Sequence, residues 1–125
     1  MATIKSYTDL SQSKKLAEIL LLESADMCYV WDYEQMCYTP ELFGFIQNQD
    51  NEGVEHIDYP CWSLAALLYV LPAECECMAL EHINYGNNRK EYFMHYVGGE
   101  NTEDHDNPID ACYEMIIRLH ELKML

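Results

Sequence analysis

Basic residues are scarce in this chain. Seven Lys and Arg stand against 22 Asp and Glu, which gives a formal net charge of −15 over 125 residues. A charge of this size promotes solubility and repels both nucleic acid and anionic membrane surfaces. We therefore expect no direct binding of nucleic acid and no membrane association. A protein is the kind of partner that this composition favours.

Long apolar runs are absent as well, because none approaches the roughly 20 residues that a membrane-spanning helix needs. The first residues, MATIKSYTDL, lack the basic and then apolar pattern of a secretion signal. Both absences predict a cytoplasmic location, where thiols stay reduced. The six cysteines are therefore expected to be unpaired rather than to form a disulfide framework.

Glycine is also rare, with five residues, and no glycine-rich phosphate loop follows a predicted strand. Ser63 lies in the sequence CWSLA, which lacks the glycines of a nucleophile elbow. No arrangement of nucleophile, base and orienting group is legible. The sequence therefore predicts no catalytic residue and no cofactor.

What the chain does contain is an almost uninterrupted apolar stretch from Pro60 to Pro72, PCWSLAALLYVLP. Apolar side chains on every side of a short helix indicate burial on all sides. Pro60 suits the first helical turn, and Pro72 ends a helix. The stretch predicts a buried central helix of two to three turns, with the other elements packed around it.

A helix is predicted near the N-terminus. Asp9 and Gln12 have the spacing of a capping box, and the amphipathic pattern that follows ends near Leu22. The residues on its inner face are expected to be Leu10, Ser13, Leu16, Ala17, Leu20 and Leu21.

A second amphipathic helix is predicted at the C-terminus, where Asn107 can cap it and Pro108 suits its first position. Glu114 precedes Arg118 by four residues, the favourable order for an ion pair on a helix. The apolar face is expected to consist of Ala111, Cys112, Met115, Ile116, Leu119 and Leu122.

Strands are predicted on both sides of the central stretch. Residues 27–33 alternate with the period of a strand. Residues 36–39 and 42–46 are expected to form one or two more strands, interrupted by Pro40, at an edge of the sheet or at a bulge. Residues 48–53 are expected to form a polar loop.

A hairpin should join residues 75–85 to 91–97 through the turn Gly86–Arg89, because glycine and asparagine tolerate positive φ. The segment ENTEDHDN that follows is expected to be an exposed acidic loop.

These elements predict an α+β fold in one small domain, residues 1–125. Three helices would pack with a mainly antiparallel sheet in the order α-β-β-α-β-β-α. An exposed strand edge near Pro40 or in the hairpin would permit a homodimer.

Two sets of side chains are candidate sites. The first set is Cys75, Cys77 and His82, which offer metal-binding or nucleophilic groups. Zinc sites usually have four ligands, and their cysteines usually have Cys-x-x-Cys spacing. Packing of these side chains in the core is therefore the favoured interpretation, and no metal site is predicted. The other set is aromatic and is a candidate interaction surface, because Tyr and Trp are enriched at interfaces. An aromatic lining of the core explains this set equally well. Its members are Tyr29, Trp31, Tyr33, Tyr92 and Tyr96.

Three segments of the chain resemble segments of other proteins. They are SYTDLSQSKKLAEILLLESADM (6–27), PCWSLAALLYVLP (60–72) and DNPIDACYEMIIRLHELKML (106–125). They resemble blocks in small acidic proteins of gut Bacteroides-type bacteria and of their phages or mobile elements. That group has no assigned activity, so the resemblance implies a bacterial cytoplasmic setting but transfers no functional residue.

Two alternative functions, which belong to different classes, are consistent with these observations. The favoured one is a non-enzymatic protein-interaction module, with DNA mimicry by its carboxylates as a special case. The alternative is a thiol- or metal-dependent enzyme that uses Cys75, Cys77 and a histidine.

Overall fold

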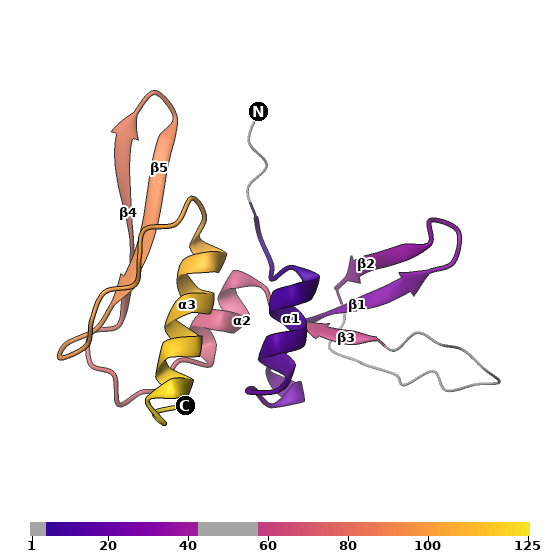
Figure 1. Cartoon of the computed structure of the whole chain (residues 1–125), viewed down its shortest axis with the longest axis horizontal. Coiled ribbons are helices and arrows are strands. Elements are labelled where there is room, and N and C mark those ends of the chain that lie inside the picture. The colour runs from indigo at the N-terminus through magenta and orange to yellow at the C-terminus, as the bar shows by residue number, and fades with distance from the viewer. Residues whose placement is uncertain (1–4, 43–57) are drawn as a thin grey trace. The chain divides into compact units, whose positions relative to one another are not determined.

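The computed structural model describes residues 5–42 and 58–125 (Figure 1). In this part of the chain it shows α-helices with two antiparallel sheets, which confirms the predicted α+β class. Backbone contacts divide the chain into two compact units. The N-terminal unit is Tyr7–Ala66, and the C-terminal unit is Leu67–Leu125 with Met1–Ser6. The assignment of residues 1–125 to a single domain stays a prediction.

The N-terminal unit is a small sheet with one helix packed on it. Strand β1 is central and pairs antiparallel with β2 and with β3, and α1 packs against β3. Met27, Tyr29 and Cys61 form its buried cluster. The elements are α1 (Leu10–Ala17), the 3-10 helix η1 (Leu22–Ser24), β1 (Met27–Asp32), β2 (Cys37–Glu41) and β3 (Tyr59–Cys61).

A buried hydroxyl joins the start of this unit to its sheet. Thr8 donates its backbone N–H to the carbonyl of Trp62 at 2.9 Å, and its Oγ1 accepts the Trp62 N–H at 3.1 Å. Ser13 Oγ lies 2.8 Å from the same Oγ1, and the Tyr29 hydroxyl donates to the Thr8 carbonyl at 2.7 Å. Thr8 therefore fixes the chain before α1 to β3 and to β1.

The predicted capping box at Asp9 and Gln12 is confirmed, since each side chain accepts the backbone N–H of the other residue. The predicted end of the helix near Leu22 is wrong, because α1 ends at Ala17. Of the expected inner face, Ser13 and Leu16 are buried, whereas Leu21 is exposed. Helical periodicity cannot show where tertiary contacts stop supporting a helix.

The predicted buried central helix is wrong in both extent and burial. Helix α2 covers only Leu64–Tyr69, and Tyr59–Cys61 form strand β3 instead of a helical turn. Pro60 is compatible with this strand because β3 is at the edge of its sheet, where a missing N–H is tolerated. Leu67 is buried, but Tyr69 is 90% exposed, so α2 is not enclosed on all sides.

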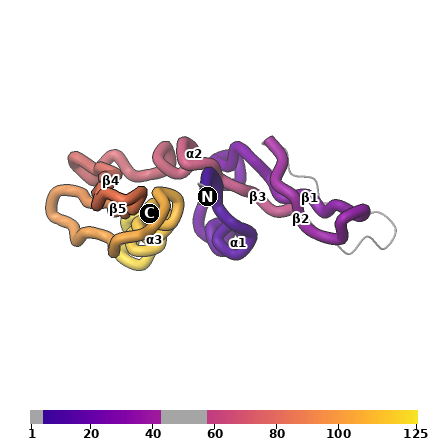
Figure 2. The backbone as a smooth tube through the Cα atoms, turned by 90° about the horizontal axis from the view of Figure 1, so that it is seen from above, coloured from indigo at the N-terminus to yellow at the C-terminus, as the bar shows by residue number. Residues whose placement is uncertain are grey.

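The C-terminal unit is a hairpin with a helix packed on it: β4 (Ala79–Gly86), β5 (Arg89–His95) and α3 (Pro108–Glu121). Figures 1 and 2 show the hairpin beside α3, which contacts both strands. The turn is the predicted one, and Asn87 and Asn88 have φ of 53° and 62°. The predicted hairpin is confirmed, although β4 begins at Ala79 and β5 ends at His95, so residues 75–78 and 96–97 lie outside the strands.

Helix α3 follows its prediction most closely. Asn107 caps it by accepting the Asp110 N–H at 2.8 Å, and Pro108 occupies the first position. The predicted ion pair of Glu114 with Arg118 is present. The expected apolar face is buried from Ala111 to Leu119, while Leu122 is 62% exposed.

The segment predicted as an exposed acidic loop is partly wrong. Thr102 is buried and exchanges hydrogen bonds with Met94, and His105 exchanges backbone hydrogen bonds with Tyr92. This segment therefore lies along β5, and its carboxylates at Glu103 and Asp104 face solvent.

Predictions for residues 43–46 and for the polar loop 48–53 fall outside the described residues. None of the helices in 5–42 and 58–125 is long and apolar enough to cross a membrane.

Candidate interaction surfaces

The structure does not gather the predicted thiol and imidazole groups into one site. Cys75 is buried in the turn before β4, whereas Cys77 is exposed, and its φ of 54° is left-handed. His82 is exposed on β4, where its ring contacts that of Tyr92. Among the residues that the structure describes, no three or more His, Cys, Asp or Glu are grouped so as to hold a metal ion.

The chemistry of Cys75 also departs from that of a reactive thiol. Burial, followed by the negative charge of Glu74, raises the pKa of its thiol. A raised pKa disfavours the thiolate, which is the form that attacks substrates and binds metals. All six cysteines are free thiols, and those at positions 28, 61, 75 and 112 are buried. Within residues 5–42 and 58–125, no arrangement of these groups supports the thiol- or metal-dependent enzyme hypothesis.

The predicted aromatic residues are divided between the two units. Tyr29 is buried in the core of the N-terminal unit. Trp31 lies two residues further along β1, and Tyr33 directly follows this strand. Tyr92 and Tyr96 belong to the C-terminal unit. Sequence alternation alone could not separate these groups, because it does not show which sheet a strand joins.

One continuous set of rings does exist in the N-terminal unit, and we call Tyr33, Trp31, Tyr38 and Tyr59 the aromatic row. Trp31 is the register partner of Tyr38 across β1 and β2, with ring centroids 5.1 Å apart. Tyr33 meets Trp31 at 6.4 Å, and Tyr38 meets Tyr59 at 5.5 Å. All three contacts are edge-to-face, the geometry that the ring quadrupole favours.

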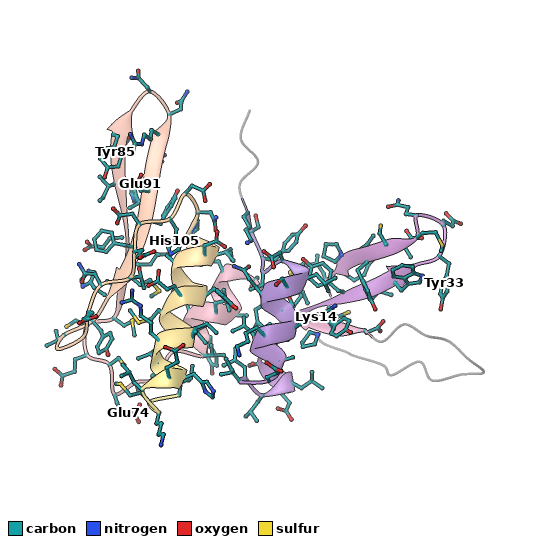
Figure 3. The ribbon with its side chains drawn as sticks, in the orientation of Figure 1. Lys14, Tyr33, Glu74, Tyr85, Glu91 and His105 are labelled. Carbon is teal, nitrogen blue, oxygen red and sulfur yellow. The ribbon has the colours of Figure 1, made fainter. Side chains whose placement is uncertain are left out.

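The aromatic row runs from the core to solvent. At its inner end, Tyr38 and Tyr59 pack against the buried cluster, and the Lys14 ammonium lies 4.8 Å from the Tyr59 ring centroid. At its outer end, Tyr33 is 59% exposed and the neighbouring Met36 is 67% exposed. Figure 3 shows Tyr33 at the tip of the β1–β2 hairpin and Lys14 on α1.

A groove is the second surface, and sequence reasoning did not find it. It has a volume of about 450 Å³ and lies between the loop after β5 and the last turns of α3. Met115 and Leu119 of α3 form one side together with Leu122, which caps the helix, and Tyr96 and residues 98–100 form the other. We call it the α3 groove. The exposed Leu122 on an otherwise buried face is the sequence position that marks it.

The walls of the α3 groove are held by a network around Glu114. Its carboxylate accepts the Glu103 N–H at 3.1 Å, lies 2.7 Å from His105 Nε2 and pairs with Arg118. Arg118 also donates to the carbonyl of Asn101 at 2.9 Å. The loop and the helix are therefore tied together next to the groove.

Comparisons with known proteins add no further assignment. No family model, curated protein or solved structure matches this chain. The candidate surfaces must therefore be interpreted from their own geometry and charge.

Proposed function

We propose that this chain is a non-enzymatic protein-interaction module whose aromatic row binds a positively charged protein. The observation that carries the proposal is the course of the row from the buried core to exposed Tyr33. Packing holds the inner rings, so on binding the loss of side-chain freedom is confined to the exposed end of the row. Tyrosine and tryptophan are also among the residues that most often dominate binding energy at interfaces.

The negative charge of the chain supports a partner with a positive net charge. A net charge of −15 attracts basic proteins over a distance and repels acidic ones. Added salt screens this attraction, so association should slow as the salt concentration rises. A DNA mimic is the special case in which the partner is a nucleic-acid-binding protein, and in that case DNA should compete for it.

The resemblance to proteins of gut Bacteroides-type bacteria, phages and mobile elements supports a bacterial cytoplasmic setting for this function. It also indicates which lysate to use in a test. The chain serves as bait in such a lysate beside the variant Tyr33→Ser/Met36→Ser, which removes the exposed end of the row. The control is Leu21→Ser/Tyr69→Ser, which removes two exposed apolar side chains elsewhere.

We expect mass spectrometry to find a basic protein that the wild type and the control capture and that the row variant loses by about tenfold, the effect of removing one strong interface contact. Equal capture by the row variant would contradict the proposal. So would a set of captured proteins that does not differ between any of the baits.

A further inference from the structure

We infer that the α3 groove binds an extended protein segment in which a lysine or arginine stands beside an apolar side chain. The groove belongs to the C-terminal unit, whereas the aromatic row belongs to the N-terminal unit. The inference therefore goes beyond the proposed function and does not rest on it.

The floor of the groove is apolar and already packed. Met115 and Leu119 are buried, while Leu122 remains largely exposed. A side chain that covers Leu122 would remove apolar surface from water, which stabilises a complex by about 25 cal/mol per Å². The volume of about 450 Å³ is in the size range of ligand pockets.

The rim of the groove is acidic. Glu100 and Glu121 both line it, both are exposed, and the structure gives neither carboxylate a hydrogen bond or ion pair to any described residue. Arg118 also lines the groove, but Glu114 compensates its charge. The uncompensated charge at the rim is therefore negative, and it favours an ammonium or guanidinium group directly above an apolar floor.

The loop that forms the other wall is fixed before a ligand arrives. Gly99 donates its N–H to the Tyr96 carbonyl at 3.1 Å, and the Asn101 carbonyl accepts from Arg118. A Cβ on Gly99 would overlap the Tyr96 ring, so this glycine allows the loop to approach the ring closely. A wall held in this way lowers the ordering cost of binding.

Charge also decides between possible occupants. A second copy of this chain would bring another −15, so electrostatic repulsion disfavours it. A basic segment with an apolar neighbour matches both the rim and the floor, because the stem of lysine or arginine can lie along Leu122 while its charged end reaches a carboxylate. A protein segment of this chemistry is therefore the occupant that we assign.

The test uses the full chain and a short fluorescein-labelled peptide of alternating leucine and lysine. Fluorescence anisotropy measures the affinity, and amide chemical shifts locate the peptide. We expect the Gly98 and Gly99 amides to shift on binding. One comparison peptide replaces leucine with serine, and another replaces lysine with glutamate. Both should bind more weakly than the probe, because each keeps only one half of the required chemistry.

Two variants of the chain remove the rim and the floor separately. Glu100→Gln/Glu121→Gln should weaken binding about fivefold, because two partly solvated ion contacts are lost. Leu122→Ser should weaken binding about tenfold, because apolar burial is lost. The matched control is Glu23→Gln/Glu34→Gln, which removes the same charge from exposed positions of the N-terminal unit and should leave the affinity within about twofold.

Three results would each overturn the inference. The first is equal weakening by the rim variant and by the control, since only net charge would then matter. The second is equal binding of the serine peptide, and the third is absence of binding at millimolar probe. The variant Tyr33→Ser/Met36→Ser should retain full peptide affinity. A result that refutes the proposal for the aromatic row can therefore be distinguished from one that refutes the proposal for the α3 groove.

Discussion

His105 Nε2 lies 2.7 Å from Oε1 of Glu114, and this contact joins the segment after β5 to α3. The two residues are nine positions apart, and both are about three-quarters buried, with side-chain exposures of 25% and 20%. The same carboxylate accepts a backbone N–H and pairs with Arg118. A single side chain thus organises the loop that forms the wall of the α3 groove.

Replacement of Glu114 should therefore destabilise the fold more than replacement of an exposed acid on the same helix. We expect Glu114→Ala to lower the free energy of unfolding by about 2 kcal/mol, because it leaves several polar partners without an acceptor. Glu121→Ala should change it by less than about 0.5 kcal/mol. Urea unfolding followed by circular dichroism measures both, and similar values for the two variants would refute the role assigned to Glu114.

The buried hydroxyl of Thr8 should matter although valine has nearly the same shape. Thr8→Val removes the acceptor of the Trp62 N–H and the partner of Ser13, and we expect a loss of about 1–2 kcal/mol. Thr39→Val is the control, because the Thr39 hydroxyl is only half-buried and lies 3.4 Å from its acceptor. Its free energy of unfolding should stay within about 0.5 kcal/mol of the wild type. Equal stability of both variants would refute the claim that the Thr8 hydroxyl stabilises the fold.

Stability should fall at alkaline pH, in part through Cys112. Burial raises the pKa of this thiol from 9.0 to about 12. Between these values the unfolded chain releases the thiol proton and the folded chain retains it, so the unfolded state binds fewer protons. The free energy of unfolding then falls as the pH rises, by up to about 1.4 kcal/mol per pH unit.

Cys112→Ala removes this titration from both states. Its free energy of unfolding should therefore fall less steeply than that of the wild type between about pH 9 and pH 11, although the variant is less stable at neutral pH. Cys77→Ala removes an exposed thiol and serves as the control. Denaturant unfolding at several pH values gives the slopes, and identical slopes for all three proteins would rule out the effect.

Gly99 should not tolerate a side chain while Tyr96 is present. A Cβ at this position would overlap the Tyr96 ring, so we expect Gly99→Ala to destabilise the fold by about 2 kcal/mol. In a Tyr96→Ala background the same change should have an effect of less than about 0.5 kcal/mol.

Gly98 is the control for this pair. Its φ of +84° is unfavourable for alanine, but apart from the adjoining residues no atom of the described chain lies within 4 Å of the Cβ position. Gly98→Ala should therefore lower stability by about 1 kcal/mol with or without the Tyr96 ring. Thermal unfolding of the double-mutant cycle separates the two causes, and additivity at Gly99 would show that the ring is not what constrains it.

Elements with strong local signals were predictable. The Asn107 cap, the apolar period of α3 and the Asn87–Asn88 turn act over a few residues, so the order of residues already contains their causes. The aromatic alternation of β1 was also legible. The assignment of Tyr29 and Tyr92 to different sheets could not be predicted, because the pairing of strands is decided by contacts between distant parts of the chain.

The apolar character of residues 60–72 was read from the sequence, but their conformation was not. Residues 59–61 became strand β3 because Met27–Tyr29 offered a partner for their backbone groups. Leu122 has the same hydrophobicity as Leu119, yet Leu119 is buried and Leu122 is largely exposed. Hydrophobicity measures the gain from burial, and it does not state whether a neighbour is there to provide it.

The charge of this protein, its α+β class, the caps and period of α3 and the hairpin can all be predicted from the order of residues, because each depends on composition or on contacts between near neighbours. The end of α1, the contact of Glu114 with His105, the course of the aromatic row from core to solvent and the groove beside α3 became visible only in the folded chain. These features depend on contacts between residues distant in sequence, and such contacts exist only after the chain has folded.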